Sequence, residues 1–380
     1  MDSCTINREV KDLVEDLKRT PLYQTHVAHG GKIIDFEGWA LPVQFTSIID
    51  EHRAVRHAAG LFDVSDMGEI MVEGADSLAL LQLALTNNME RGRPGQVIYS
   101  PMCNEQGGVV DDLLIYCMGN DRYMLVVNAG NIEKDYQWLQ GLAARFSHVS
   151  VSNESDDVGQ IALQGPNSQA ILQELTDCNL DVMKYYHFED KVNVGGIEGL
   201  VSRTGYTGED GFEVYCKPKD TPVLWEALMA NAASWDLVPA GLGCRDTLRF
   251  EAGMPLYGQE LDDERTPVEA KLSKFIDFTK EEFVGRERLL KQKEEKPKIR
   301  LIGFEMLGRG IPRTGYPLLS GGEEVGYVTT GSFAPSLNKN LGMGYVPWEL
   351  RKIGTDLVVQ IRNREVEARV VKTPFYRKGK

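Results

Sequence analysis

The chain has 380 residues and a formal net charge of −14, with 42% hydrophobic and 26% charged residues, which is typical of a soluble globular protein of two or three domains. The acidic balance argues against binding to a phosphate backbone, so we expect no nucleic-acid partner. No apolar run reaches the roughly 20 residues of a membrane-spanning helix, so we expect no membrane association.

The N-terminal residues are charged and include acids, unlike those of a secretory signal or a transit peptide. This predicts a cytoplasmic protein and leaves open a mature organellar chain. The six cysteines are scattered without a C-x-x-C pair, which favours buried free thiols over a zinc or disulfide framework. The spacings of His26 with His29 and of His52 with His57 do not match H-E-x-x-H, so we expect no metal site.

In chain order, residues 10–18 alternate charged and apolar character as a short amphipathic helix does. Gly30-Gly31 is typical of a hairpin turn between short strands. The aromatic-rich segment 38–45 contains Pro42 and predicts a packed loop. Further helices are expected at 47–58, 76–85, 132–146, 167–175, 221–233 and 244–252. Further strands are expected at 61–64, 69–72, 123–127, 161–164, 195–203 and 211–216.

Segment 104–116, NEQGGVVDDLLIY, carries the first hint of chemistry. Gly107-Gly108 allows a turn, and a strand rich in β-branched and bulky apolar residues follows it. Asp111 and Asp112 interrupt this strand, although a charge in an apolar run is costly unless something pairs with it. Because successive strand residues face opposite sides, one of the two carboxylates must lie on the buried face or in a cleft.

The charged segment 291–298, KQKEEKPK, predicts an interdomain linker. Beyond it, glycines recur at short intervals between apolar segments, as in a small β-barrel or sandwich. The chain contains no sustained βαβ repeat, no G-x-G-x-x-G and no Walker A loop. These features predict an α+β protein with antiparallel sheets and an all-β C-terminal domain.

Two further segments carry candidate ligand-binding residues. In the glycine-rich loop 203–211, Glu209 is suited to accept two hydrogen bonds from an amidine-like ligand edge, although a hairpin with solvated charges explains the loop equally well. Tyr185 and Tyr186 are suited to stack on a flat heteroaromatic ligand, although neighbouring aromatic residues more often pack in a core or at its rim.

Segment 240–251 predicts a helix start with small residues that allow a close approach. Arg245 lies at this start, where its guanidinium is suited to clamp a carboxylate. Arg249 lies one turn later, and we expect it to pair structurally with Asp246 or Glu251.

A longer set of segments is recognisable in order along nearly the whole chain: TPLYQTHVAHGGKIIDFEGWALPVQF, GLFDVSDMGEI, NEQGGVVDDLLIY, ALQGPNSQAIL, RTGYTGEDGFEVY, PAGLGCRDTLRFEAGMPLYG, GRGIPRTGYPL, GYVTTGSFAPSLNKNLGMGYV and KTPFYR. Together they resemble the glycine cleavage T-protein family of aminomethyltransferases. One position departs from the family pattern, because Asp66 in VSDMG stands where the family commonly has a histidine. We assign Asp66 no part in the chemistry, so the departure does not change the expected activity.

The resemblance implies an α+β, three-domain folate-binding fold with antiparallel sheets flanked by helices and a small C-terminal all-β barrel. Residues 1–290 would form the catalytic region, as two interleaved subdomains of approximately 1–55 with 145–235 and 56–144 with 236–290. Residues 291–298 would be the linker, and 299–380 the barrel.

The resemblance also implies tetrahydrofolate as the co-substrate and the lipoylated H protein of the glycine cleavage system as the partner. The aminomethyl group on the lipoyl arm would give its methylene to tetrahydrofolate, with release of ammonia. The catalytic role falls on Asp112 as the inward, folate-facing acid, and Asp111 would be structural. The remaining ligand contacts would be Tyr99, Leu114, Tyr116, Asn128, Tyr185, Tyr186, Glu209, Arg245 and Arg377.

Two other functions stay open. A tetrahydrofolate-dependent demethylase shares the fold resemblance but accepts a sulfonium or similar donor. A non-catalytic folate-binding accessory protein would carry a Lys-Gly-Cys-Tyr-type motif where this chain has RTGY at 203–206. The segments quoted above match the T-protein family more closely than either alternative.

Overall fold

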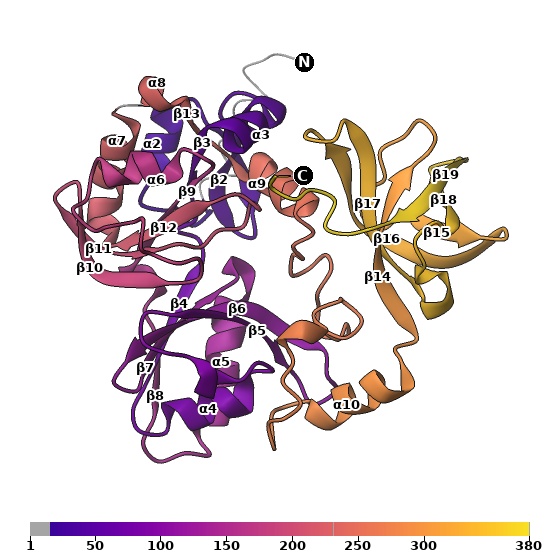
Figure 1. The fold of residues 1–380 in the computed structure, drawn as a ribbon, viewed down its shortest axis with the longest axis horizontal. Helices are drawn as coiled ribbons and strands as arrows, with labels where there is room; N and C mark the ends of the chain where they lie inside the picture. Colours follow the sequence, from indigo (N-terminus) through magenta and orange to yellow (C-terminus); the bar gives the residue numbers. More distant parts are fainter. Residues whose placement is uncertain (1–15, 231, 380) are drawn as a thin grey trace. The chain divides into compact units, whose positions relative to one another are not determined.

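A computed structural model of the chain describes residues 16–230 and 232–379. The chain divides into two compact units, each built from two separate stretches of sequence (Figure 1). The first unit is the described part of Met1–Glu69 with Asn153–Asp246, and the second is Ile70–Ser152 with the described part of Thr247–Lys380. The subdomain borders expected from the sequence stay predictions. The helix expected at 10–18 lies outside the described residues, except for 16–18, which form a turn, a bend and an isolated bridge.

A six-stranded sheet forms the centre of the first unit. Across the sheet the strands lie in the order β10 (Phe188–Val194), β11 (Ile197–Ser202), β12 (Gly211–Cys216), β9 (Gly159–Gln164), β3 (Ala59–Asp63) and β13 (Leu237–Pro239). Neighbouring strands are antiparallel, except that β13 runs parallel to β3. Every residue of β12, β9 and β3 is buried, as expected for strands near the middle of a covered sheet.

The first unit also contains one small hairpin sheet and several helices. Its remaining elements are α2 (Tyr23–Ala28), β1 (Lys32–Phe36), β2 (Trp39–Gln44), α3 (Ile48–His57), α6 (Ser168–Gln173), α7 (Thr221–Met229), α8 (Ala232–Trp235) and the 3₁₀ turns η3 (Ser155–Asp157) and η4 (Pro218–Asp220). Helix α3 begins after Ser47, whose hydroxyl accepts a hydrogen bond from the backbone N–H of Asp50 at 3.1 Å. Trp225 of α7 is fully buried against sheet residues such as Phe212 and Leu163, which closes the core of this unit.

Two sequence predictions in the first unit are wrong. Gly30-Gly31 does not turn a hairpin, because α2 occupies 23–28 and Gly30 ends it with a positive φ of 78°. The hairpin turn lies instead between Phe36 and Trp39, where β1 meets β2. Segment 39–44, expected as a loop, is strand β2, and Pro42 is tolerated there because this sheet has only two strands.

The second unit contains a five-stranded sheet with helices. Its strands lie in the order β5 (Val97–Cys103), β6 (Val109–Gly119), β7 (Arg122–Val127), β4 (Gly68–Glu73) and β8 (Ser150–Asn153). The associated helical elements are α4 (Ser77–Ala84), η1 (Met89–Arg91), η2 (Ala129–Asn131) and α5 (Ile132–Ala143). Leu81 of α4 and Leu139 of α5 pack with Leu113 and Ile115 of β6, so the two helices cover one face of this sheet.

The C-terminal part of the second unit is a closed six-stranded barrel, as the sequence predicts. Its strands follow the order β14 (Ile299–Met306), β17 (Lys339–Pro347), β16 (Glu323–Ala334), β15 (Pro317–Ser320), β18 (Asp356–Ile361) and β19 (Arg364–Val371), and β19 pairs with β14 to close it. All neighbouring strands are antiparallel. The other elements are α9 (Leu242–Glu251), η5 (Ser273–Phe275), α10 (Arg286–Glu295) and η6 (Trp348–Arg351). Because α10 continues to Glu295, the first part of the expected linker at 291–298 is helical.

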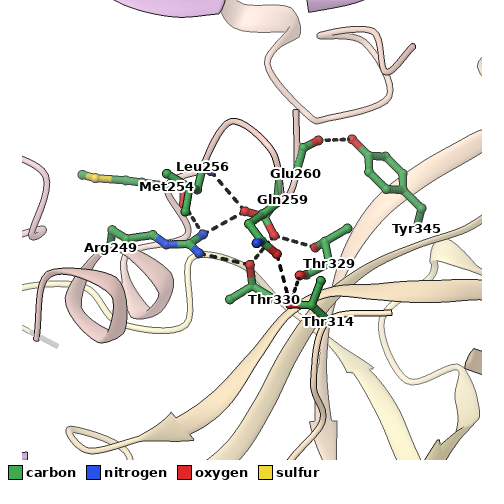
Figure 2. Close-up of polar contacts among 9 residues, drawn as sticks. All are labelled: Arg249, Met254, Leu256, Gln259, Glu260, Thr314, Thr329, Thr330 and Tyr345. Carbon is green, nitrogen blue, oxygen red and sulfur yellow. Dashed lines mark hydrogen bonds and ion pairs between the residues drawn. The ribbon is translucent and has the colours of Figure 1, made fainter. Parts of the chain in front are cut away.

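A buried ion pair connects α9 to the barrel (Figure 2). The guanidinium of Arg249 contacts Glu260 at 2.8 Å, and the two side chains are 2% and 0% exposed. Arg249 also donates to Thr330 of β16 at 3.1 Å, and Thr329 and Thr330 both donate to Glu260. Glu260 is a partner that the sequence did not indicate for Arg249. Because each charge is neutralised and hydrogen-bonded, this network fixes segment 254–260 on the barrel.

Two further findings concern the described residues as a whole. None of their helices is long and apolar enough to cross a membrane. Their five cysteines are free thiols, and four of them are buried.

Candidate active site

Asp111 and Asp112 lie near the start of β6 and point to opposite faces of its sheet. Asp111 pairs with Met102 and Asp112 with Pro101 across the antiparallel β5–β6 pair. Asp111 has the same strand parity as Leu113, whose side chain belongs to the helix-covered core. The alternation expected from the sequence is present. The expected inward position of Asp112 needs correction, because Asp111 is fully buried and Asp112 keeps partial exposure.

The Asp112 carboxylate receives two side-chain hydrogen bonds. The phenolic O–H of Tyr99 donates to Oδ2 at 2.9 Å, and Nδ2 of Asn128 donates to Oδ1 at 3.2 Å. Burial and the neighbouring charge of Asp111 raise the pKa of Asp112 to about 7, and the two hydrogen bonds partly oppose this shift. The carboxyl group therefore titrates near neutral pH, which is useful for a group that handles charge or protons.

Asp111 is enclosed by N–H donors from the start of α5. Its Oδ1 accepts hydrogen bonds from the side-chain amides of Asn128 and Asn131 at 2.7 and 2.8 Å, and its Oδ2 accepts from the backbone N–H of Asn128 at 3.0 Å. Asn131 is the residue before the first turn of α5, so Asp111 lies at the positive end of this helix. Since Asn128 also contacts Asp112, its amide links the two carboxylates.

Tyr99, Leu114 and Tyr116 share the Asp112 face of the sheet. Leu114 and Tyr116 follow Asp112 at intervals of two, and Tyr99 is the cross-strand partner of Leu114. The ring of Tyr99 packs edge-on against Phe275 with centroids 4.5 Å apart, which fixes the direction of its hydroxyl. Leu114 keeps partial exposure, whereas Tyr116 is fully buried and supports this face from within.

The glycine turn before β6 packs closely on another segment of the second unit. Gly107 has a φ of +84° and its N–H donates to the carbonyl of Asn104 at 2.9 Å. A Cβ added to Gly108 would lie 1.7 Å from the carbonyl oxygen of Asp263. Val109 then donates to the carbonyl of Asp262 at 2.9 Å. The two glycines therefore set the turn, as predicted, and let segment 262–265 lie against the start of β6.

Glu209, the candidate acceptor in the first unit, is buried in an ion pair. Its Oε1 lies 3.1 Å from Nη1 of Arg56, a residue of α3, and both side chains are at most 3% exposed. The same nitrogen donates to the carbonyl of Thr207 at 2.7 Å. Arg203 and Asp210 of this loop also form an ion pair. The loop connects the antiparallel strands β11 and β12, as the hairpin alternative proposed, but these charges are paired within the protein and not solvated.

Tyr185 and Tyr186 lie in the segment that precedes β10. Their rings meet edge to face with centroids 4.7 Å apart, and Tyr185 is 51% exposed. Tyr186 has a φ of +60°, which is uncommon for a bulky residue, and its N–H donates to the carbonyl of Arg203 at 3.0 Å. Tyr185 thus presents an accessible aromatic surface on a constrained backbone.

Arg245 lies in the first turn of α9, as the sequence predicts. Its guanidinium lies over the ring of Tyr206, 4.7 Å from the centroid. Burial raises the pKa of Asp66 to about 7 and raises the pKa of Glu213, and the positive charge of Arg245 opposes both shifts. Asp66, at the position that departs from the family pattern, is thus a buried acid within the electrostatic range of Arg245.

Arg377 lies in the second unit, after the end of β19, and is exposed to solvent. The preceding residue, Tyr376, donates its backbone N–H to the carbonyl of Glu251 at 2.8 Å. The C-terminal segment is therefore fixed to the end of α9 immediately before Arg377.

Several residues at these sites were not identified from the sequence. They are Arg56 beside Glu209, and Asn131, Lys134, Asp135 and Tyr257 in the neighbourhood of Asp111. The spacing of Asn128, Asn131 and Asp135 after a strand, three and then four residues apart, places polar side chains on one side of a helix start and was a usable signal. No group of three or more His, Cys, Asp or Glu in the described ranges is arranged to hold a metal ion.

The fold and these residues define a class: an α+β protein with a C-terminal antiparallel barrel and a paired-carboxylate site on an interior strand of an antiparallel sheet. The sequence matches two family models, the GCVT N-terminal domain over residues 22–280 and the glycine cleavage T-protein C-terminal barrel domain over residues 300–377. The chain belongs to the glycine cleavage T-protein family.

Individual relatives agree with this assignment. The chain is 52% identical to the aminomethyltransferase of Caldanaerobacter subterraneus over 368 residues, covering 97% of this chain and 98% of the relative. It is also 52% identical to the aminomethyltransferase of Geobacillus kaustophilus, covering 96% and 100%. Among solved structures, the glycine cleavage system aminomethyltransferase T of Bartonella henselae superimposes with a TM-score of 0.88 at 32% identity, covering 95% of this chain and 98% of that chain.

Proposed function

We propose that this chain is an aminomethyltransferase that moves the methylene carbon of an aminomethyl group, carried on the lipoyl arm of an H protein, to tetrahydrofolate. Support comes from the family match over both parts of the chain and from the names of its relatives. The observation in the structure that carries the proposal is Asp112, a titratable carboxyl group on a partly exposed strand face between Tyr99 and Asn128.

The reaction balances without an oxidant or a reductant. The carbon breaks its bonds to the lipoyl sulfur and to the amino nitrogen, and it forms one bond to each of two folate nitrogens. Each folate nitrogen loses a proton; one proton ends on the sulfur and the other on ammonia, which leaves as ammonium. Positive charge develops on the carbon and nitrogen as the first of these bonds breaks, so a fixed negative charge nearby lowers the barrier.

Asp112 supplies this charge in its ionised form. Its two hydrogen bonds fix the carboxylate, so little reorganisation is needed when positive charge develops. The same group orients the folate nitrogens for attack, which is a contribution of positioning. Because its pKa is raised to about 7, Asp112 also has the affinity to hold one of the released protons.

The other expected ligand residues have separate roles in this proposal. In the second unit, Leu114 provides apolar surface beside Asp112, Tyr116 supports that surface from within, and Arg377 provides a positive charge for a carboxylate. In the first unit, Tyr185 and Tyr186 provide aromatic surface, Glu209 accepts hydrogen bonds from a pterin edge, and Arg245 binds a carboxylate or carbonyl group. Glu209 can serve in this way while paired with Arg56, because a carboxylate has about four acceptor positions.

The alternatives make different predictions for the donor. A demethylase requires a sulfonium or similar methyl donor, and an accessory protein binds folate without turnover. The relatives named above are aminomethyltransferases, which favours neither alternative.

The proposal is tested by incubating the purified chain with tetrahydrofolate and aminomethyl-loaded H protein. We expect release of ammonia and formation of methylenetetrahydrofolate in equal amounts, and loss of both when H protein is omitted. Parallel incubations use a sulfonium donor without H protein, and calorimetry with tetrahydrofolate alone. Turnover with the sulfonium donor only would favour the demethylase, and folate binding with no turnover in any incubation would favour the accessory protein.

A further inference from the structure

A second buried carboxyl group, Asp135, lies close to Asp111 and has no part in the proposed reaction so far. Asp135 lies in the first turn of α5, four residues after Asn131 and therefore on the same side of the helix. The residue is 0% exposed. No N–H or hydroxyl donor in the part of the chain that the structure describes reaches either of its carboxyl oxygens, and the side-chain hydrogen bond that it forms is with Asp111, another acid. An ionised carboxylate in such a place would be strongly unfavourable.

The charged groups around Asp135 do not compensate a negative charge. Asp111 and Asp112 of β6 are both acids and both raise the pKa of Asp135, as burial does to a greater extent. The positive charge of Lys134 opposes this rise in pKa only in part. The ammonium group of Lys134 contacts the hydroxyl of Tyr257 at 2.6 Å and lies 4.0 Å from the centre of its ring, so its interactions are directed to Tyr257.

Asp111 has the opposite surroundings. Its carboxylate oxygens accept three hydrogen bonds from N–H groups of Asn128 and Asn131. The groups that face Asp111 are N–H donors, which stabilise a carboxylate, and the positive end of α5 adds to the preference for negative charge. The two buried acids therefore differ in their surroundings: those of Asp111 stabilise a negative charge, and those of Asp135 do not.

We propose that Asp135 is a positioning residue that stays a neutral carboxylic acid in the folded protein, so that the Asp111–Asp135 pair carries one negative charge and holds Asn128 in place for Asp112. Asn128 donates to both Asp111 and Asp112 from one amide group. A second charge beside Asp111 would repel the first and disturb this amide, and it would also disfavour the ionised form of Asp112.

The role of Asp135 in turnover rests on the proposed function, but its protonation state does not. An acid that is neutral when folded and ionised when unfolded takes up a proton on folding. Its contribution to stability is therefore fully present below its unfolded pKa of about 3.9 and falls as pH rises toward the raised folded pKa. Asn cannot titrate, so Asp135→Asn removes this pH dependence.

The first measurement compares denaturant unfolding of the parent, Asp135→Asn and Glu133→Gln, the last being an exposed acid in the same turn of α5. The unfolding equilibrium constant of the parent is expected to rise, relative to that of Asp135→Asn, by about tenfold for each pH unit between roughly pH 5 and pH 8. The ratio of the unfolding constants of the parent and Glu133→Gln is expected to stay constant over the same pH range. If the ratio of the unfolding constant of the parent to that of Asp135→Asn is constant or falls as pH rises, the proposal is overturned.

The second measurement is infrared spectroscopy at about pH 8, where ordinary carboxyl groups are ionised. The parent is expected to show a carboxylic acid C=O band that Asp135→Asn lacks and Asp112→Asn retains. If Asp135→Asn does not fold, Asp135→Leu replaces it in this comparison. A parent spectrum with no band lost in either Asp135 variant would overturn the proposal, whether or not the protein turns over.

The positioning role is tested by the pH profile of turnover. Asp135→Asn keeps N–H donors for Asp111, so the acidic limb assigned to Asp112 is expected to stay within about half a pH unit of the parent. Asp135→Leu has no donor, releases Asn128 and is expected to move this limb to higher pH, because the Asn128 hydrogen bond lowers the pKa of Asp112. Limbs that coincide in all three proteins would reduce Asp135 to a packing residue and overturn the positioning role.

Discussion

Tyr99 donates its phenolic hydrogen bond to Asp112 across the β5–β6 pair, over a distance of 2.9 Å. The ring of Tyr99 is itself fixed by an edge-on contact with Phe275. The geometry of the catalytic candidate therefore depends on a neighbouring strand and on the segment 273–275 that packs against it. This relationship can be tested without changing the carboxylate.

Tyr99→Phe removes the hydroxyl and keeps the ring that contacts Phe275. Because the Tyr99 hydrogen bond lowers the pKa of Asp112, its loss is expected to move the acidic limb of the pH–rate profile to higher pH. A hydrogen bond to a charged group contributes about 1.5 kcal/mol or more, so turnover near pH 7 is expected to fall by about tenfold. Steady-state rates of methylenetetrahydrofolate formation across pH check this, and a profile that overlays that of the parent would contradict it.

The pH dependence of the parent follows from the direction of the Asp112 shift. Burial and Asp111 raise its pKa to about 7, so the carboxyl group is neutral below that pH and ionised above it. Because the proposed role requires the ionised form, turnover is expected to rise about tenfold per pH unit below pH 7 and to level off above it. A rate that is flat or falls across this range, measured with loaded H protein in excess, would contradict the role.

The same shift predicts an effect on stability. Ionisation of Asp112 in the folded state is disfavoured, so its contribution to stability is fully present below the unfolded pKa and is lost as pH rises toward 7. Asp112→Asn is therefore expected to be more stable than the parent above pH 7, and the difference is expected to shrink toward about pH 4. Urea unfolding at several pH values measures the difference. A variant less stable than the parent at about pH 8 would show that the charge is favourable in the fold.

The buried pair of Arg249 and Glu260 is expected to contribute strongly to folding. Glu260→Gln leaves the guanidinium without its ionic partner and is expected to lower the free energy of unfolding by about 3–5 kcal/mol. The matched control is Asp356→Asn, which breaks the exposed pair with Arg369 in the same barrel and is expected to change the free energy of unfolding far less, because solvent screens this pair. Equal losses in the two variants would contradict this account.

Gly108→Ala tests the close approach that starts β6. The added Cβ would lie 1.7 Å from the carbonyl oxygen of Asp263, so backbone must move, and we expect a loss of about 1–3 kcal/mol in the free energy of unfolding. The control is Gly141→Ala in α5, where a Cβ meets nothing within 4 Å and helix propensity predicts a gain of up to about 1 kcal/mol. Thermal unfolding of both variants checks the pair; a Gly108→Ala variant as stable as the parent would show that segment 262–265 adapts easily.

The sequence predicted those features that depend on local pattern. Apolar periodicity placed the helices from α3 to α9 within a few residues, and glycine spacing indicated the C-terminal barrel. Strand alternation separated Asp111 from Asp112, because the period of two does not depend on tertiary context. It could not tell which face would be covered by helices, so the depth of the two acids was assigned the wrong way round.

Features that depend on distant partners were missed for a physical reason. Glu209 meets Arg56, 153 residues away. Arg249, expected to pair with Asp246 or Glu251, also binds Glu260 and Thr330, which is 81 residues away. A charge can be satisfied by any partner that the fold delivers, and sequence spacing constrains only those within a few turns. The error at Gly30-Gly31 had another origin, since the same glycine chemistry ends a helix and turns a hairpin.

The central claim is that the ionised carboxylate of Asp112 acts on the transferred carbon, whereas Asp111 supports the fold. The most direct test compares turnover of the parent, Asp112→Asn and Asp111→Asn at about pH 8 with tetrahydrofolate and aminomethyl-loaded H protein, after each variant is shown to be folded. We predict a loss of about 100-fold or more for Asp112→Asn and a smaller loss for Asp111→Asn, accompanied by lower stability. Near-normal turnover of Asp112→Asn, or a larger loss at Asp111 than at Asp112, would contradict this claim.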